Sequence, residues 1–109
     1  MMDERLKAIA DHYLLADQTI KAKEELAELS DEINILHWDY RSWWSCNDDE
    51  AIYIPSNRNE LIGEIADVQI MIEQLIYLLN IEQKEIDKVR EFKLNRQIER
   101  IRAENENTR

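Results

Sequence analysis

Glycine and proline are almost absent from this chain of 109 residues, which contains one of each. Sheet-rich folds need many tight turns, and turns depend on residues of this kind. The sequence is 44% hydrophobic and 35% charged, a balance that favours long helices over a disordered chain. Together with the length, these features predict an all-α fold built as a single domain over residues 1–109.

Cysteine is equally scarce, since Cys46 is the only one and an intrachain disulfide is therefore excluded. The sequence also lacks a signal peptide and an apolar run long enough to span a bilayer. These absences predict a cytoplasmic protein without a membrane partner. A domain of this length buries only a modest core of its own, so we also expect a homodimer or homotetramer.

Basic side chains are in the minority, and the net charge is −10. Nucleic acids and anionic membranes bind basic surfaces, so this charge argues against nucleic-acid binding. The charge is uneven: residues 1–83 carry 6 basic and 18 acidic side chains, a net −12, whereas residues 84–109 carry 8 and 6, a net +2. The C-terminal segment is thus the part suited to face an anion.

Hydrophobic spacing predicts four helices. The first covers about residues 3–13, the second begins near residue 15 and ends before a loop at about 45–59, and the others cover about 58–79 and 82–104. Ser56 or Asn57 is expected to cap the third helix. In the second helix, mainly apolar residues recur at alternating spacings of four and three, which predicts a packing seam. This seam consists of Leu15, Thr19, Ala22, Leu26, Leu29, Ile33, Leu36 and Tyr40.

Apolar side chains surround most of the third helix, as Ile62, Ile65 and Ile72 illustrate. A helix of this kind is normally buried on nearly all sides, and we expect a partner subunit to cover part of it. Its remaining stripe carries Glu60, Glu64, Asp67, Met71 and Gln74. Acids therefore lie on a helix that has little access to water.

Two acidic motifs, Glu25-x-x-Glu28 and Glu64-x-x-Asp67, lie on the second and third helices. Residues three apart on a helix point the same way, so each motif presents two carboxylates from one face. Four such groups would repel one another unless a cation neutralised them, and hard divalent ions take oxygen ligands. The motifs therefore predict a magnesium site, the alternative being two solvated helix faces. A di-iron bundle is excluded because the chain has no Glu-x-x-His motif.

The segments KAKEELAELSDEI, NELIGEIADVQIMIEQL and KLNRQIERI, within residues 15–102, resemble the MazG-like nucleoside triphosphate pyrophosphohydrolases. The resemblance implies a four-helix MazG-like bundle completed by oligomerisation. It also implies hydrolysis of an NTP or dNTP to the monophosphate and pyrophosphate, in the manner of an enzyme that cleans nucleotide pools. Glu25, Glu28, Glu64 and Asp67 would be the catalytic metal ligands, with Mg²⁺ as the cofactor and Mn²⁺ as a substitute.

The same resemblance assigns the substrate-binding residues. Lys93 and Arg96 match the family's basic positions and would contact the phosphate chain, with Arg100 as a weaker member of the set. Lys21 and Gln18, on the second helix, are further candidates for contact with the nucleotide. For the basic residues the alternative is a solvent-facing stripe, and for Gln18 it is an ordinary surface position.

One departure from the family pattern leaves a second function open. Gly63 stands where many members of the family carry another Glu, so Glu60 would have to supply that acid, or fewer metals would bind. The alternative function is a non-catalytic helical module that binds nucleotides or regulates through oligomerisation. The preferred base and sugar do not follow from the sequence.

Overall fold

The computed structural model describes residues 2–46 and 52–107, and every regular element among them is a helix. The helices are α1 (Glu4–His12), α2 (Leu15–Cys46), α3 (Arg58–Leu78) and α4 (Gln83–Asn107). The all-α prediction is therefore confirmed. The chain forms two compact units, Met1–Leu78 and Leu79–Arg109, which are described separately. None of the helices described has the length and apolar character needed to cross a membrane.

Local chemistry explains where the helices begin and end. The Asp3 side chain caps α1 by accepting a hydrogen bond of 2.9 Å from the Arg5 amide. After α3, Asn80 adopts a left-handed conformation with φ 54°, which ends the helix. Before α4, the Glu85 carboxylate accepts a hydrogen bond of 2.8 Å from the Glu82 amide, half of a capping box.

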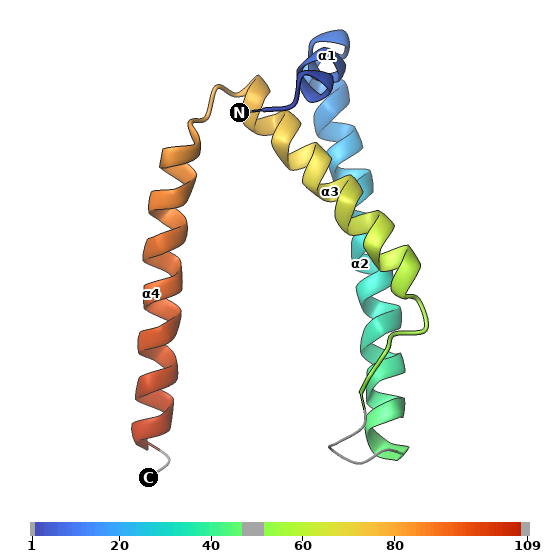
Figure 1. Ribbon diagram of the computed structural model, residues 1–109, viewed down its shortest axis with the longest axis vertical. Coiled ribbons are helices and arrows are strands. Elements are labelled where there is room, and N and C mark those ends of the chain that lie inside the picture. Colours follow the sequence, from blue (N-terminus) through green and yellow to red (C-terminus); the bar gives the residue numbers. More distant parts are fainter. Residues whose placement is uncertain (1, 47–51, 108–109) are drawn as a thin grey trace. The chain divides into compact units, whose positions relative to one another are not determined.

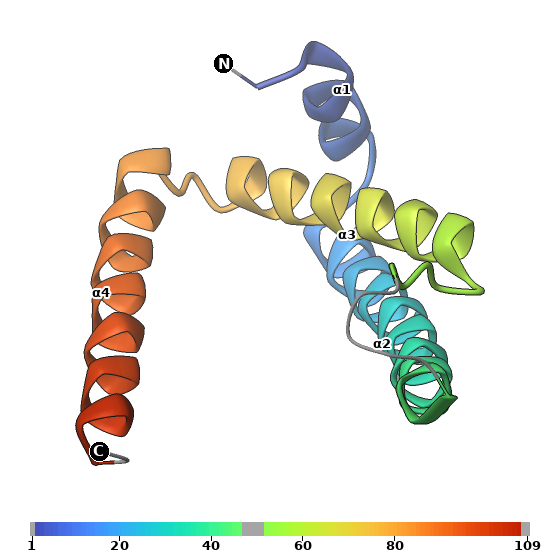
Figure 2. The same cartoon turned by 60° about the horizontal axis from the view of Figure 1, so that its bottom comes forward.

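In the first unit, α3 packs along α2 in the opposite direction, and α1 also contacts α3 (Figures 1 and 2). The side chains that α3 buries follow one stripe: Leu61, Val68, Met71 and Gln74, with Glu64 half-buried among them. A hydrogen bond of 2.8 Å from the Tyr77 hydroxyl to Asp11 ties α3 to α1. The first unit is thus organised around α3.

The packing seam predicted for α2 is wrong in part. Ala22 is buried and Leu29 is half-buried as expected, but Leu26 and Ile33 are about half exposed, at 53% and 50%. The buried residues of α2 are instead Gln18, Ala22 and Glu25. The spacing correctly identified an apolar stripe that includes Leu26 and Ile33. The stripe of α2 that packs against α3 is a neighbouring, more polar one that includes Gln18 and Glu25.

The apolar face of α3 is only partly covered within this unit, so its burial on nearly all sides, with the help of a partner subunit, stays a prediction. Ile62, Ile65 and Ile72 remain 49%, 45% and 49% exposed, respectively. The reason is that α3 turns its polar stripe, with Glu64 and Gln74, towards the inside of the unit. Its surplus apolar face has no cover from the described residues of this unit.

The segment leading into α3 is held to α2 by hydrogen bonds. Asp39 accepts from the Tyr53 hydroxyl at 2.7 Å and from the Ser56 amide at 3.2 Å. The Asn57 carbonyl begins α3 by accepting from the Leu61 amide at 3.0 Å, so Asn57 does occupy the cap position. Its side chain does not act as the expected cap, because Nδ2 donates to the Glu32 carbonyl at 2.9 Å and to its carboxylate at 2.6 Å.

These bonds generate a stability prediction. Asn57→Ala removes two bonds between the start of α3 and α2 from a buried position, and should lower the free energy of unfolding by about 1–3 kcal/mol. Asn59→Ala is the matched control, because Asn59 is exposed in the first turn of the same helix. Chemical denaturation of both variants measures the difference. Equal midpoints and slopes for both variants would contradict the role given to Asn57.

Candidate metal centre

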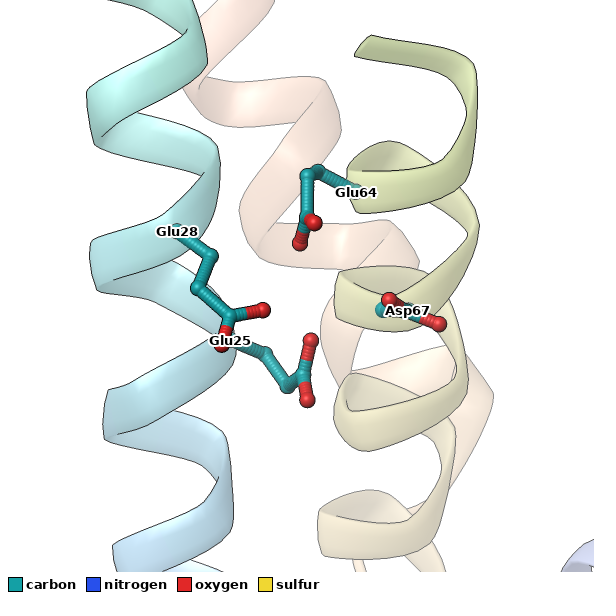
Figure 3. Close-up of side chains that lie close together, drawn as sticks. All are labelled: Glu25, Glu28, Glu64 and Asp67. Atoms are coloured by element: carbon teal, nitrogen blue, oxygen red, sulfur yellow. The ribbon is translucent and has the colours of Figure 1, made fainter. Parts of the chain in front are cut away.

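Two helices place the four acids of the sequence motifs opposite one another. Glu25 and Glu28 extend from α2 towards α3, and Glu64 extends from α3 towards α2, with Asp67 one turn further along (Figure 3). One carboxylate oxygen from each residue can be chosen so that all four lie within 4.8 Å of one another. The structure thus brings together the acids that spacing alone had put in two separate pairs.

Burial distinguishes this cluster from an ordinary acidic surface. Glu25 is only 6% exposed and Glu64 is half-buried, and the Oε2 atom of each is buried without a hydrogen-bond partner among residues 2–46 and 52–107. A buried carboxylate oxygen without a partner is costly, because it has lost its hydration. A cation between the helices would supply the missing interaction. Glu28 and Asp67 are exposed, so the site can be reached from solvent.

The chemistry of the donors fits a hard divalent cation. All four side chains offer carboxylate oxygens, which Mg²⁺ prefers, and the cluster contains no nitrogen or sulfur ligand. Mn²⁺ accepts the same donors. The cluster could therefore hold Mg²⁺, with Glu25 and Glu64 contributing the oxygens that lack partners.

The four carboxylates differ in their electrostatic surroundings. Burial raises the pKa of Glu64, and the negative charges of Glu28, Asp67 and Glu25 raise it further. The pKa of Glu25 is lowered, chiefly by its hydrogen bond with Lys21, whose Nζ lies 2.9 Å from Oε1. Lys21 thus neutralises one acid of the cluster, while repulsion is concentrated on Glu64.

A cavity of about 450 Å³ adjoins the acids within the first unit. Glu25 and Asp67 form part of its wall, and so do the predicted substrate-binding residues Lys21 and Gln18. Gln18 is 4% exposed, so it is not the ordinary surface residue that the alternative assumed. The structure therefore brings Gln18 and Lys21 to the same side of the acids.

The remaining predicted residues lie elsewhere. Lys93, Arg96 and Arg100 belong to α4 in the second unit, where the Arg96 guanidinium carbon lies 5.6 Å from the centre of the Phe92 ring. Their contact with a substrate stays a prediction. Glu60 is exposed and is not one of the four clustered acids.

Sequence reasoning passed over Gln74, which lines the same cavity and is the most deeply buried large side chain among the described residues. The available signal was its place on the polar stripe of α3, seven residues after Asp67. Positions seven apart on a helix lie on the same face, so Gln74 was to be expected on the same side of α3 as Asp67.

Comparisons with known proteins add no family to this geometry. The chain matches no protein-family model, and neither the search of curated proteins nor that of solved structures found a match.

Magnesium should stabilise the folded protein if the acids bind it together. At free Mg²⁺ about tenfold above the dissociation constant, mass action adds about 1.4 kcal/mol, and each kcal/mol corresponds to about 4–8 °C in a small domain. Asp67→Asn should reduce this shift strongly. Calorimetry across millimolar MgCl₂, with matched ionic strength from KCl, measures it. A melting temperature independent of Mg²⁺ in the unaltered protein would contradict the metal centre.

The repulsion on Glu64 leads to a second prediction. Glu64→Gln removes one charge from the crowded centre and should raise the midpoint of urea unfolding at neutral pH without divalent ions. In millimolar Mg²⁺ the same variant should lose its advantage, because it also lacks a ligand. Glu60→Gln, one turn earlier and exposed, is the control and should leave both midpoints nearly unchanged. A lower midpoint for Glu64→Gln in metal-free buffer would disprove the repulsion.

Proposed function

We propose that this chain is a magnesium-dependent nucleoside triphosphate pyrophosphohydrolase of the MazG-like kind. It would cleave an NTP or dNTP to the monophosphate and pyrophosphate, and so clear nucleotides from the cytoplasmic pool. The observation that carries the proposal is the convergence of four carboxylates within 4.8 Å, two of them with buried oxygens that lack partners. The resemblance of the segments around these acids to the MazG-like enzymes supports the same reading.

The proposed chemistry divides the work among residues of the chain. Bound divalent cations would supply charge against the phosphate oxygens and lower the pKa of a water. The four acids hold these ions between α2 and α3, and Lys21 lies beside them as a cation that can turn from Glu25 to the phosphate chain. The water gives up a proton to solvent as its oxygen forms a bond to the α phosphorus, and the bond from that phosphorus to the α–β bridging oxygen breaks. The electron pair leaves with the pyrophosphate.

Basic residues of α4 complete the proposed site. Lys93, Arg96 and Arg100 share one face of this helix, and we assign them to the β and γ phosphates, where negative charge develops on the leaving group. The net charge is +2 for residues 84–109 and −12 for residues 1–83, so the segment that contains α4 is the part of the chain suited to an anionic ligand.

Oligomerisation is the second part of the proposal. Apolar side chains are exposed along α2 and α3, including Leu26, Ile33, Ile62 and Ile65, and α4 has no buried residue. Most of the stability of a helix in a protein comes from tertiary packing of one face, and α4 buries none of its side chains among the described residues. A homodimer or homotetramer that covers these faces would complete the four-helix MazG-like bundle.

The molar mass of the protein in solution tests the proposed assembly. Light scattering at micromolar concentration should give a dimer or tetramer, and Ile62→Glu with Ile65→Glu should shift the mass towards the monomer, because two charges would be buried at the interface. Glu73→Lys, at an exposed polar position of α3, controls for charge changes as such. A monomeric mass for the unaltered protein would refute the assembly.

The alternative is a non-catalytic nucleotide-binding or regulatory oligomerisation module. Gly63 replaces an acid that many MazG-like enzymes carry, and Glu60 lies outside the cluster. A site with four acids could bind fewer metals, and would then hold a nucleotide without cleaving it. Turnover separates the two functions.

The decisive measurement is pyrophosphate release from a panel of NTPs, dNTPs and modified dNTPs with Mg²⁺. Asp67→Asn and Glu28→Gln should each lower kcat/KM by about a hundredfold or more, since each removes a charged ligand at an exposed, fold-tolerant position. Glu60→Gln should retain activity. Absence of pyrophosphate from every nucleotide, with nucleotide binding intact, would establish the alternative function instead.

A further inference from the structure

Gln74 is a buried amide without an obvious structural purpose. It is 2% exposed, and its Oε1 atom is buried without a hydrogen-bond partner among the residues described. A buried carbonyl oxygen normally has a partner in a folded protein. Gln74 also lines the cavity of about 450 Å³, which places the amide where a ligand could supply that partner.

A second buried amide faces the same cavity from α2. Gln18 precedes Glu25 by seven residues, and Gln74 follows Asp67 by seven. Because α2 and α3 run in opposite directions, both displacements lead the same way along the helix pair (Figure 1). The two amides therefore lie two turns from the acids, roughly 10 Å along the helices.

The rest of the cavity is suited to a flat organic ring. Ile9 of α1, Tyr13 directly after α1 and Met71 of α3 contribute apolar and aromatic side chains to its wall, while Glu25 and Asp67 connect it to the acid cluster. Its volume lies in the ordinary range for a small-molecule site. A ligand with phosphates at the acids and an aromatic ring bearing hydrogen-bonding groups would match both ends. A nucleotide has this construction.

We propose that Gln74, assisted by Gln18, reads the nucleobase and determines which nucleotide this chain accepts. The inference rests on the proposed function only in placing the phosphates at the acids. Gln74 Oε1 accepts a hydrogen bond from an N–H group on the base, and its amide NH₂ donates to the neighbouring carbonyl oxygen or ring nitrogen. Recognition through buried hydrogen bonds rejects a ligand that lacks them, because the protein group is then left without a partner.

The test measures binding rather than cleavage. AMP, GMP, CMP, UMP and dTMP are titrated by calorimetry in MgCl₂, with ribose 5-phosphate as a probe that has no base. At least one nucleotide should bind about tenfold or more tightly than ribose 5-phosphate. Methylation of that nucleotide's hydrogen-bonding N–H should abolish the advantage. Equal affinity for ribose 5-phosphate and every nucleotide, or no binding of any, would overturn the inference.

Variants assign the effect to Gln74. Gln74→Met keeps an unbranched side chain of similar size without polar hydrogen bonds, and should reduce the preference over ribose 5-phosphate by about tenfold. Gln69→Met, at an exposed position of the same helix, should leave the preference unchanged. Gln74→Glu keeps an acceptor but loses the NH₂ donor, so it should alter the order of preferred bases even if Gln74→Met fails to fold. An unchanged order in both variants would refute the assignment.

The outcomes separate this inference from the proposed function. If the chain cleaves NTPs but its base preference is the same in the Gln74 variants, the proposed hydrolase activity is supported and the base-reading role of Gln74 is refuted. If the base preference depends on Gln74 but the chain cleaves no nucleotide, the base-reading role is supported and the proposed hydrolase activity is refuted. Asp67→Asn provides the internal check, since it should abolish turnover and preserve the order of bases.

Discussion

The structure depends on the contact between α2 and α3, which buries carboxylates where a helix pair would ordinarily bury hydrophobic side chains. Glu25 and Glu64 face each other across this contact, each with a buried oxygen that lacks a partner. Their mutual repulsion is relieved in part by Lys21, which pairs with Glu25, and it contributes to the raised pKa of Glu64. A divalent cation would relieve it more completely than either, because it can interact with several carboxylates at once.

Orienting the polar stripes inward has a consequence for the outer surface. The apolar side chains of α3 that cannot face α2, such as Ile62 and Ile72, are left about half exposed. Leu26 and Ile33 form a similar stripe on α2. The partly polar interior and the half-exposed apolar exterior thus both follow from which faces of α2 and α3 pack together, and this links the proposed site to the proposed assembly.

The hydrogen bonds before α3 determine how the two acid pairs meet. Asn57 and Tyr53 are bonded to Glu32 and Asp39 of α2, which lie about one turn and about three turns beyond Glu28. These contacts fix where α3 begins along α2, because Asn57 also accepts the first hydrogen bond of α3. Moving α3 by one helical turn, about 5.4 Å, would separate Glu64 and Asp67 from their counterparts. The same register brings Gln18 and Gln74 to one level of the cavity.

The sequence by itself determined the helices, their approximate ends and the two acid pairs, because capping groups, breakers and a spacing of three residues are local features. It also marked the polar stripe of α3 that contains Gln74. Only the tertiary structure decided that this stripe faces α2, that Gln18 and Glu25 are buried while Leu26 is exposed, and that the Asn57 side chain bonds to α2. The reason is that helical periodicity records every face that will be covered, by this chain or by another, whereas the neighbour that covers each face depends on contacts between distant residues.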